Sequence, residues 1–449
     1  MLRIEDHNRR WWILGAVAGV LGMVVLDETV VGVALPTIRD DLRMSEVASH
    51  WVVNAYLLIL ASLAAAGGRL GDFLGIKRVF IGALVIFGLG SLAAGLSQDS
   101  AWIITARSIQ GIGAAVIFPS TVAMITHVFP RDQRGLAFGI QTATGGVFIS
   151  LGPLVGGFFT EVLSWRWVFW INLPAVVVIL AIISIAWVNP SRKGHRSRPD
   201  FFGLIALVPG LGALVLGLMQ GTVWGWSAPA TLALLSGGAI MIVVFLVVEL
   251  RVFEPLLEVA LFRDATFTGS NLVIFTGQFN KIAIIVFLAL YLQDVLHMSP
   301  LNAGFVLLAA AVPTLFTSIP AGQLADRFGA RWLSLGGLFL NGTALFWIGF
   351  AISLERVGLL VPLLVIWGAT LPFLYAPTRR AVMNAVPEEK QGQASGINLT
   401  AQLLGGTIGM AVGSTLLATT SDFRLVFLFA GGLSVVALMT GLFTIERHP

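Results

Sequence analysis

Cysteine is absent from this 449-residue chain, and charged side chains make up only 11% of it. Without cysteine there are no disulfides, thiolate nucleophiles or thiolate metal sites. The six His fall near predicted helix ends or in loops, which argues against a His-based proton relay or zinc site. A soluble domain has roughly 25% charged residues. A chain with 57% hydrophobic residues therefore has the composition of an integral membrane protein.

Long apolar stretches recur from one end of the sequence to the other. A helix needs about 18 or more apolar residues to cross roughly 30 Å of hydrocarbon. Fourteen stretches meet this condition, at 12–36, 48–68, 79–97, 102–125, 136–160, 167–188, 202–220, 227–248, 267–291, 301–322, 332–353, 357–378, 394–417 and 423–445. Because no alternating strand pattern of ~10 residues appears, the sequence predicts an all-α membrane protein.

The basic residues predict the orientation of the chain. With the N-terminus inside, most of the 27 Lys and Arg fall in cytoplasmic segments, so the positive-inside rule places both termini in the cytoplasm. We expect a multi-pass protein of the cytoplasmic (inner) membrane, surrounded by membrane lipids. The basic residues are spread over short links rather than clustered with aromatics, so the net charge of +4 does not indicate a nucleic-acid partner.

Two links between helices repeat one another. "GGRLGDFLGIKR" at 67–78 and "AGQLADRFGARW" at 321–332 align without a gap, and each lies between the second and third helix of a six-helix block. We therefore predict two related six-helix bundles, 1–190 and 266–449. An inserted transmembrane helix pair with cytoplasmic linkers, 191–265, joins them. Such repeats commonly enclose a substrate site near the membrane midplane.

The repeated links also predict a conformational gate. Glycine permits positive-φ turns and close helix approach. A charge-assisted hydrogen bond from an Arg or a helix N-terminus to an Asp would make a strong but reversible latch. Ordinary solvated turns are the alternative. The candidate gate residues are Gly68, Asp72, Gly75, Lys77, Arg78, Asp326, Arg327, Gly329 and Arg331.

These links resemble those of the major facilitator superfamily, and over nearly the whole chain the sequence resembles its fourteen-helix drug:proton antiporter branch. "ARSIQGIGAAVIFPS" at 106–120 is similar to the family's fourth-helix motif, and "LDETVVGVALP" at 26–36 to the branch's first-helix signature. The resemblance implies the major facilitator fold. The sequence departs from the family pattern at Phe73 and Ile76, where Arg is usual or common, and at Gly32, where Asn is usual.

"GPLVGG" at 152–157 resembles the fifth-helix antiporter motif, which is the family's sign of export rather than uptake. Its glycines and proline predict a kinkable, closely packed helix. The candidate residues of this motif are Gly152, Pro153, Gly156 and Gly157.

Two adjacent carboxylates, Asp27 and Glu28, interrupt the first apolar stretch. A charge inside the bilayer costs at least ~2.5–3.5 kcal/mol on insertion scales, so it has to be neutralised, paired or placed in a water-filled cavity. A carboxyl whose surroundings alternate changes its proton affinity, which is what a proton carrier needs. Neighbouring helical residues point about 100° apart, and the resemblance assigns the role of the acid to Asp27.

The candidate proton-coupling residues are Asp27, Glu28 and Arg107. For Asp27 the alternative is a structural ion pair with Arg107, and for Glu28 it is an accessory role in lining the pore or packing helices. The resemblance implies that Arg107 bonds backbone or pairs with the first-helix acid. Its alternative is snorkelling to the outer interface.

Other polar residues within the apolar stretches are candidates for the substrate cavity. Lys281 lies about ten residues, roughly 15 Å, from the outer end of its helix. We expect it to face Asp27 across the substrate path, as an anchor for an anionic group or as a counterion, with a structural ion pair as the alternative. For the others, packing between helices is the alternative. The full set is Asn54, Tyr56, Gln110, Gln141, Gln278, Asn280, Lys281, Asn341, Tyr375, Asn398 and Gln402.

From this resemblance we predict proton-coupled efflux, by alternating access, of amphipathic organic compounds or drugs. Such an antiporter needs no cofactor, is driven by the proton gradient and works as a monomer. An exporter dedicated to one anionic or lipid-like metabolite is the alternative within transport. A membrane-embedded enzyme is the rival from another class. It would need a catalytic pair or metal ligands at depth, whereas the sequence offers one deep acidic pair and no deep His.

Overall fold

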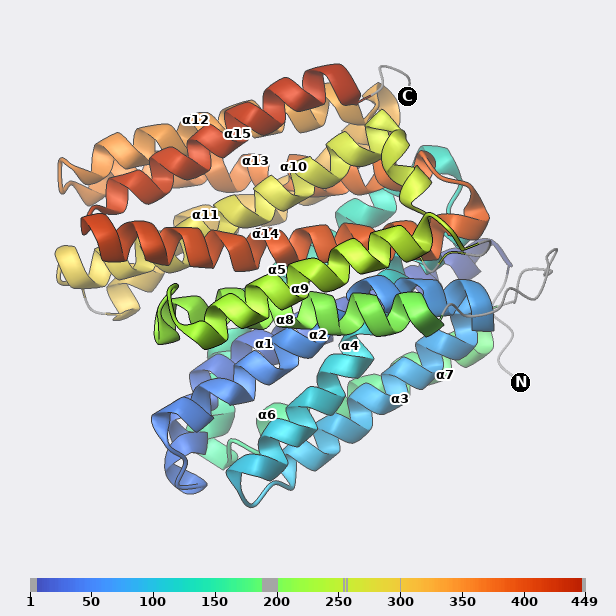
Figure 1. Ribbon diagram of the computed structural model, residues 1–449, viewed down its shortest axis with the longest axis horizontal. Helices are drawn as coiled ribbons and strands as arrows, with labels where there is room; N and C mark the ends of the chain where they lie inside the picture. Colours follow the sequence, from blue (N-terminus) through green and yellow to red (C-terminus); the bar gives the residue numbers. More distant parts are fainter. Residues whose placement is uncertain (1–5, 188–200, 253–254, 256, 299, 446–449) are drawn as a thin grey trace.

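The computed structural model describes residues 6–187, 201–252, 255, 257–298 and 300–445. The basic connector at 189–200 lies outside the described residues, as do the side chains of Asp72, Phe73 and Pro153. Within the described part, fourteen helices are long and apolar enough to cross a membrane. The predicted all-α architecture with fourteen spans is confirmed (Figure 1).

The elements follow one another as long helices with short links. The first group contains α1 (Asp6–Asp41), α2 (Glu46–Leu74), α3 (Ile76–Gly95), α4 (Ser100–Val128), η1 (Arg131–Gln133), α5 (Arg134–Phe158), η2 (Phe159–Leu163), α6 (Trp167–Trp170) and α7 (Asn172–Ala186). Next come α8 (Phe201–Trp224) and α9 (Pro229–Glu249). The second group contains η3 (Val259–Arg263), α10 (Ala265–Ile282), η4 (Ala283–Leu288), η5 (Tyr291–Val295), α11 (Pro300–Phe328), α12 (Ala330–Ile352), α13 (Val357–Asn384), η6 (Glu388–Lys390), α14 (Gln391–Thr420) and α15 (Phe423–Thr444).

Polar side chains begin several of these helices. Ser45, Asp99, Asp264 and Asp422 each accept a hydrogen bond from a backbone N–H in the first turn of α2, α4, α10 and α15. Such caps satisfy donors that have no partner within the helix. The short polar links in the sequence therefore fix where these spans start.

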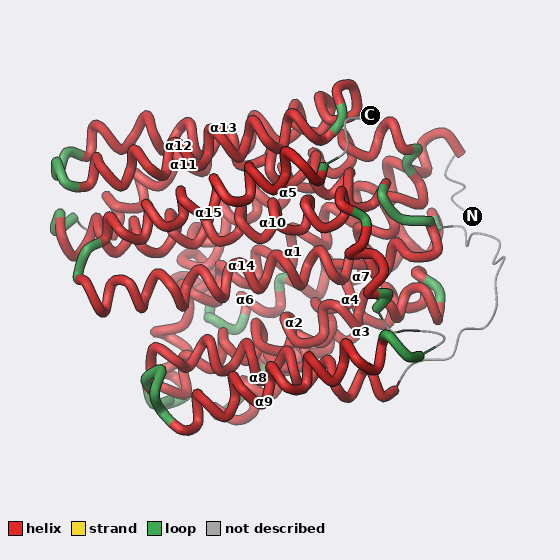
Figure 2. The backbone as a smooth tube through the Cα atoms, turned by 45° about the horizontal axis from the view of Figure 1, so that its top comes forward, coloured by secondary structure: helices red, strands yellow, loops and turns green. Residues whose placement is uncertain are grey.

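The helices pack as two groups with α8 and α9 beside them. Helices α1–α7 contact mainly one another, and α10–α15 do the same. The groups meet chiefly through α5 against α11 and α2 against α14. Helices α8 and α9 pair with each other, and α8 also contacts α2 and α14, so the inserted pair lies along one side of the seam between the groups (Figure 2).

Helix α1 begins and α15 ends at the same end of the molecule, which we call the basal end; the opposite end is the distal end (Figure 1). Close contacts between the groups are found toward the basal end. Gly68 of α2 meets Gly392 of α14, and Gly135 of α5 meets Gly322 of α11. A Cβ atom on Gly322 would overlap the carbonyl oxygen of Gly135. The glycines thus let the two backbones touch.

The two repeated links have the same local structure. Gly75 and Gly329, which join the second helix to the third in each group, have φ angles of 92° and 79°, as the sequence predicted. Lys77 donates through Nζ to the carbonyl of Ser184 at 3.1 Å, and Arg331 donates through Nη1 to that of Ile445 at 2.8 Å. Both cations therefore cap the last helix of their own group.

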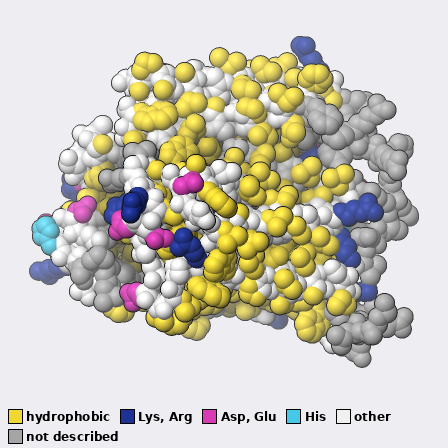
Figure 3. Space-filling model, turned by 90° about the horizontal axis from the view of Figure 1, so that it is seen from below, with side chains coloured by type: hydrophobic (Ala, Val, Ile, Leu, Met, Phe, Trp, Pro, Cys, Tyr) yellow, Lys and Arg dark blue, Asp and Glu magenta, His cyan; other side chains and the backbone are white. Residues whose placement is uncertain are grey.

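The surface of the molecule is largely apolar between its two ends. Figure 3 shows hydrophobic side chains across the middle, with charged side chains toward the ends. Large apolar side chains such as Leu154, Phe316 and Phe443 are 71%, 75% and 85% exposed. Apolar exposure on this scale fits hydrocarbon as the surrounding solvent. The protein is a multi-pass membrane protein.

The Gly135–Gly322 contact leads to a prediction about closure of the basal end. Gly322→Val should hold α5 and α11 apart, because the new side chain would occupy the space of the Gly135 carbonyl. The native chain has no cysteine, so cysteines introduced at Asp132 and Glu388 would carry the only spin labels. Pulsed electron paramagnetic resonance should show a longer basal distance in the variant.

Gly304→Val on the same helix is the matched control, since nothing lies within 4 Å of a Cβ there. An unchanged distance in Gly322→Val would show that the close contact does not set the closure.

Candidate functional site

Asp27 lies in α1 and is only 1% exposed. Arg107 of α4 donates to its carboxylate, with Nη1 2.5 Å from Oδ2, and the Arg107 side chain is itself fully buried. Nε of Arg107 donates to the carbonyl oxygen of Val52 in α2 at 3.0 Å. Arg107 therefore points into the first group rather than out to an interface. It joins α1, α2 and α4 through one guanidinium.

Two amides complete the surroundings of this carboxylate. Gln110 donates to Asp27 Oδ1 at 3.2 Å, and Asn172 of α7 donates to the same oxygen at 2.8 Å. Both amides also donate to Ser91 Oγ of α3, at 2.7 and 3.2 Å. We call Asp27, Ser91, Arg107, Gln110 and Asn172 the Asp27 cluster. Sequence reasoning missed Ser91 and Asn172, because small polar residues on apolar helices resemble ordinary packing residues.

Two further candidates pack around the Asp27 cluster. The guanidinium carbon of Arg107 lies 4.3 Å from the centroid of the Tyr56 ring, a cation–π arrangement. On the other side of α1, Gly152 of α5 meets Thr29 and Gly156 meets the backbone of Val30. The fifth-helix motif thus brings α5 directly against the turn of α1 that follows Asp27. Gly157 has open space beside it.

Glu28 lies beside the Asp27 cluster, where it interacts electrostatically with Asp27 and Arg107, and it also reaches the seam between the groups. Its side chain is partly buried and interacts electrostatically with Lys281 of α10. The acid opposite Lys281 is therefore Glu28, whereas the sequence led us to expect Asp27. The angle of about 100° between neighbouring helical residues explains the difference. Lys281 lies two residues before the first residue of the π-helical element η4, a distortion that is frequent near functional sites.

A second set of linked polar side chains lies in the second group, on α10, α13 and α14. Gln278 Oε1 accepts from Tyr375 Oη at 2.8 Å and from Gln402 Nε2 at 3.5 Å. Arg379 Nη2 donates to Gln402 Oε1 at 2.9 Å. We call Gln278, Tyr375, Arg379 and Gln402 the Arg379 cluster. Lys281 lies one turn beyond Gln278 on α10 and interacts electrostatically with Arg379.

Sequence reasoning missed Arg379. The apolar stretch at 357–378 ends just before it, so Arg379 was not among the candidate residues. Helix α13 continues to Asn384, which keeps Arg379 on the helical face that Tyr375 occupies one turn earlier. That four-residue spacing is the signal that would have identified it.

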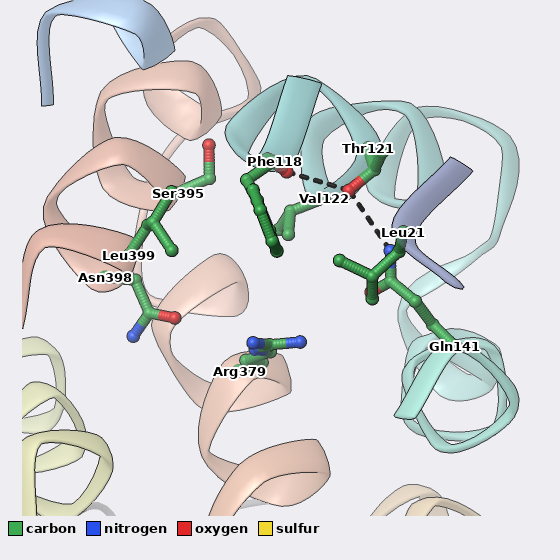
Figure 4. A pocket seen from close by; sticks show the side chains of 9 residues that line it. All are labelled: Leu21, Phe118, Thr121, Val122, Gln141, Arg379, Ser395, Asn398 and Leu399. Atoms are coloured by element: carbon green, nitrogen blue, oxygen red, sulfur yellow. Dashed lines mark hydrogen bonds between the residues drawn. The ribbon is translucent and has the colours of Figure 1, made fainter. Parts of the chain in front are cut away.

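Arg379 also borders a small pocket between the two groups (Figure 4). Gln141 and Thr121 line it from the first group and are joined by a hydrogen bond of 3.1 Å. Asn398 lines it from the second group and donates to Asn271 at 3.0 Å. The cavity volume is about 10 Å³, room for about one water molecule. The path between the groups is thus almost closed at this level.

The remaining candidates lie elsewhere. Asn280 is fully buried and donates to Asn341 Oδ1 at 3.0 Å and to Ser434 Oγ at 2.8 Å. Asn341 in turn donates to Thr370 Oγ1 at 3.4 Å. We call these four residues the Asn280 cluster; it joins α10, α12, α13 and α15 within the second group. Asn54 is partly buried on α2.

At the basal end Asp326 of α11 joins the two groups, and we call this set of contacts the Asp326 latch. Its two carboxylate oxygens accept from the backbone N–H groups of Gly135 and Leu136 at 2.8 Å each, at the start of α5. Arg380 Nε donates to the same carboxylate at 3.0 Å. Sequence reasoning anticipated both kinds of donor for this Asp but did not identify Arg380. Arg78 and Arg327 are exposed beside the links.

Comparison with known proteins places these features in a family. The model of the Major Facilitator Superfamily matches residues 17–250 and 270–449. A puromycin resistance protein of Streptomyces alboniger is 33% identical over 416 residues, which cover 91% of this chain and 82% of that protein. A cephamycin export protein of Amycolatopsis lactamdurans is 35% identical over 399 residues, covering 87% and 81%. The structure of a proton:xylose symporter of this superfamily superimposes with a TM-score of 0.71 at 15% identity, covering 99% of this chain and 97% of that one.

The Asp27–Arg107 ion pair leads to a prediction about stability. Arg107→Gln would leave an ionised Asp27 buried without its cation, at a cost of about 3–5 kcal/mol. Gln is similar in length but carries no positive charge, so the variant should unfold at a lower temperature than the native chain. Thermal unfolding of the detergent-solubilised protein tests this. Arg356→Gln, at an exposed position, is the control, and equal unfolding temperatures for the two variants would contradict the prediction.

The Asp326 latch leads to a second prediction. Asp326→Asn removes the charge that Arg380 and the start of α5 stabilise, and charge-assisted hydrogen bonds contribute ~1.5–3 kcal/mol each. The basal end should open more often, so a cysteine at Thr121, which lines the pocket, should react about tenfold faster with an impermeant thiol reagent added on the basal side. Asp132→Asn in exposed η1 serves as the control. Unchanged labelling in Asp326→Asn would show that this carboxylate is no latch.

Proposed function

Because this chain belongs to the major facilitator superfamily, we propose that it exports amphipathic organic compounds or drugs across the cytoplasmic membrane in exchange for protons. The chain is a transporter and not an enzyme. The curated relatives named above are a resistance protein and an export protein, which supports the outward direction of transport.

The observation that carries proton coupling is the Asp27 cluster. Every hydrogen bond that the Asp27 carboxylate accepts there is donated by a side chain of α4 or α7, and one donor is a guanidinium. A carboxylate accepts all of these bonds, whereas a protonated acid has one oxygen that must donate. Adding a proton therefore breaks the ion pair and releases Arg107 from α1. Proton binding changes how three helices of the first group are held together.

The Asp326 latch would control access from the cytoplasm during the transport cycle. In the orientation that we propose, both termini and the basal end face the cytoplasm, and closure by Asp326 blocks cytoplasmic access. A proton from the outside then reaches Asp27 while substrate leaves. The groups rock, the latch opens, and Asp27 releases its proton to the cytoplasm as new substrate binds. Alternating access of this kind needs no cofactor beyond the proton gradient.

We further propose that the division into 1–190, 191–265 and 266–449 describes the moving parts. Contacts within each group outnumber those between groups, as two rocking bundles require. The inserted pair α8–α9 touches α2 and α14 at the seam, where it would shield the moving interface from lipid. This arrangement functions as a monomer.

Export of a single compound is the second candidate function. The relatives are named for puromycin and for cephamycin, one antibiotic each. The polar Arg379 cluster also gives the seam fixed hydrogen-bonding positions, which favour a narrow substrate range over a purely apolar cavity. Protection of a pump-deficient host against many compounds or against one separates the two candidates.

Proton flux in everted vesicles tests the coupling. The native chain should release protons when a transported compound is added, and Asp27→Asn should abolish that release because Asn binds no proton. Asp294→Asn, at an exposed position near the distal end, is the matched control and should behave like the native chain. Normal coupling in Asp27→Asn would contradict the assignment and turn attention to Glu28.

A further inference from the structure

We infer that Arg379 and Lys281 form a binding subsite for one acidic group, of the carboxylate type, on the transported compound. This inference rests on the proposed export function and specifies the chemistry of its substrate. The group would sit at the seam, on the side of the second helix group, with the apolar body of the compound against the first group.

The polar side chains along the seam carry more positive than negative charge. Two cations, Lys281 and Arg379, interact with each other electrostatically, and Glu28 is the acid that interacts with Lys281. Among the described residues, no carboxylate lies within ion-pair distance of Arg379. A buried cation without a counterion is costly, and such groups inside membranes mark substrate or ion pathways. A bound anion would restore the balance.

Arg379 also has unused hydrogen-bonding capacity. Its Nη2 donates to Gln402, and its guanidinium carbon lies 5.9 Å from the Tyr375 ring centroid. Its Nε is buried and has no hydrogen-bond partner among the described residues. A guanidinium offers donors in a planar fork that matches a carboxylate. The free edge of Arg379 therefore suits an acid oxygen.

The surroundings suit an amphipathic compound. Figure 4 shows the guanidinium of Arg379 extending toward the space bordered by Leu21, Phe118 and Leu399. Leu21 and Phe118 face Arg379 from the first group, and Leu399 borders the same space from the second group. In the present closed state this space admits about one water molecule, so the compound would enter when the basal end opens.

Binding of a matched pair of probes tests the subsite. The pair is dansyl-labelled undecanoate and its methyl ester, measured by fluorescence with purified protein in nanodiscs of phosphatidylcholine. The acid should bind the native chain more tightly than the ester. Arg379→Gln should weaken acid binding about tenfold to a hundredfold, the range expected for a lost charge-assisted hydrogen bond. It should leave ester binding unchanged.

Two further variants test whether acid binding is lost only because the protein misfolds. Arg379→Lys keeps the charge and should retain most of the preference for the acid, which a folding defect would not restore. Arg263→Gln removes an exposed arginine near the basal end and should bind both probes like the native chain. Equal binding of acid and ester by the native chain, or an equal loss of both in Arg379→Gln, would overturn the inference.

A third arm separates the substrate from a lipid headgroup as the source of the anion. Nanodiscs that contain phosphatidylglycerol should bind the acid as well as neutral discs do. Loss of acid binding in those discs would assign the subsite to lipid phosphate and overturn its role in substrate binding. None of these measurements depends on proton coupling, so the inference can fail while proton-driven export stands, and the reverse also holds.

Discussion

The ion pair between Asp27 and Arg107 is the constraint on which the first helix group depends. A carboxylate and a guanidinium that are both fully buried must satisfy one another, since neither water nor lipid supplies a partner. The pair then fixes α1 against α4, and the added amides of the Asp27 cluster bring in α3 and α7. The packing of these four helices therefore depends on the charge of the Asp27 carboxyl group.

The second group contains the neutral counterpart of this arrangement. The Asn280 cluster joins the first, third, fourth and sixth helices of its block, as the Asp27 cluster does in the first block. In each block the next residue along the helix turns to the seam: Glu28 in one and Lys281 in the other. The repeat thus places a carboxyl group, Asp27, in the first group and an amide, Asn280, at the matching place in the second. Glu28 and Lys281, which have opposite charges, face one another across the seam. In the cycle that we propose, a proton on Asp27 would change the packing of the first group alone.

The number and order of the helices could be predicted from the sequence, because the length of each apolar stretch indicates a membrane span and the repeated links mark the same place in each six-helix block. Asp27, Arg107 and Asp326 were also accessible, since a charge within an apolar stretch or beside a repeated glycine turn demands a partner. The identity of the partners was not. Asn172 and Ser91 are ordinary residues until α7 and α3 pack against α1. Arg379 was missed because hydropathy ended the helix before Arg379, while tertiary packing extends α13 to Asn384.

In the mechanism that we propose, the position of Arg379 in the chain would connect substrate binding to the Asp326 latch. Its neighbour Arg380 donates to Asp326 in the latch, while Arg379 itself borders the seam. Consecutive residues of one helix move together, so α13 cannot shift to admit an acid at Arg379 without also moving the donor that holds Asp326. Entry of substrate from the basal side would therefore be linked to the opening of that side, and departure of the acid would let Arg380 return to the latch. In the proposed mechanism Arg379 would bind the acidic group of the substrate, and Arg380 would hold the basal end closed through Asp326.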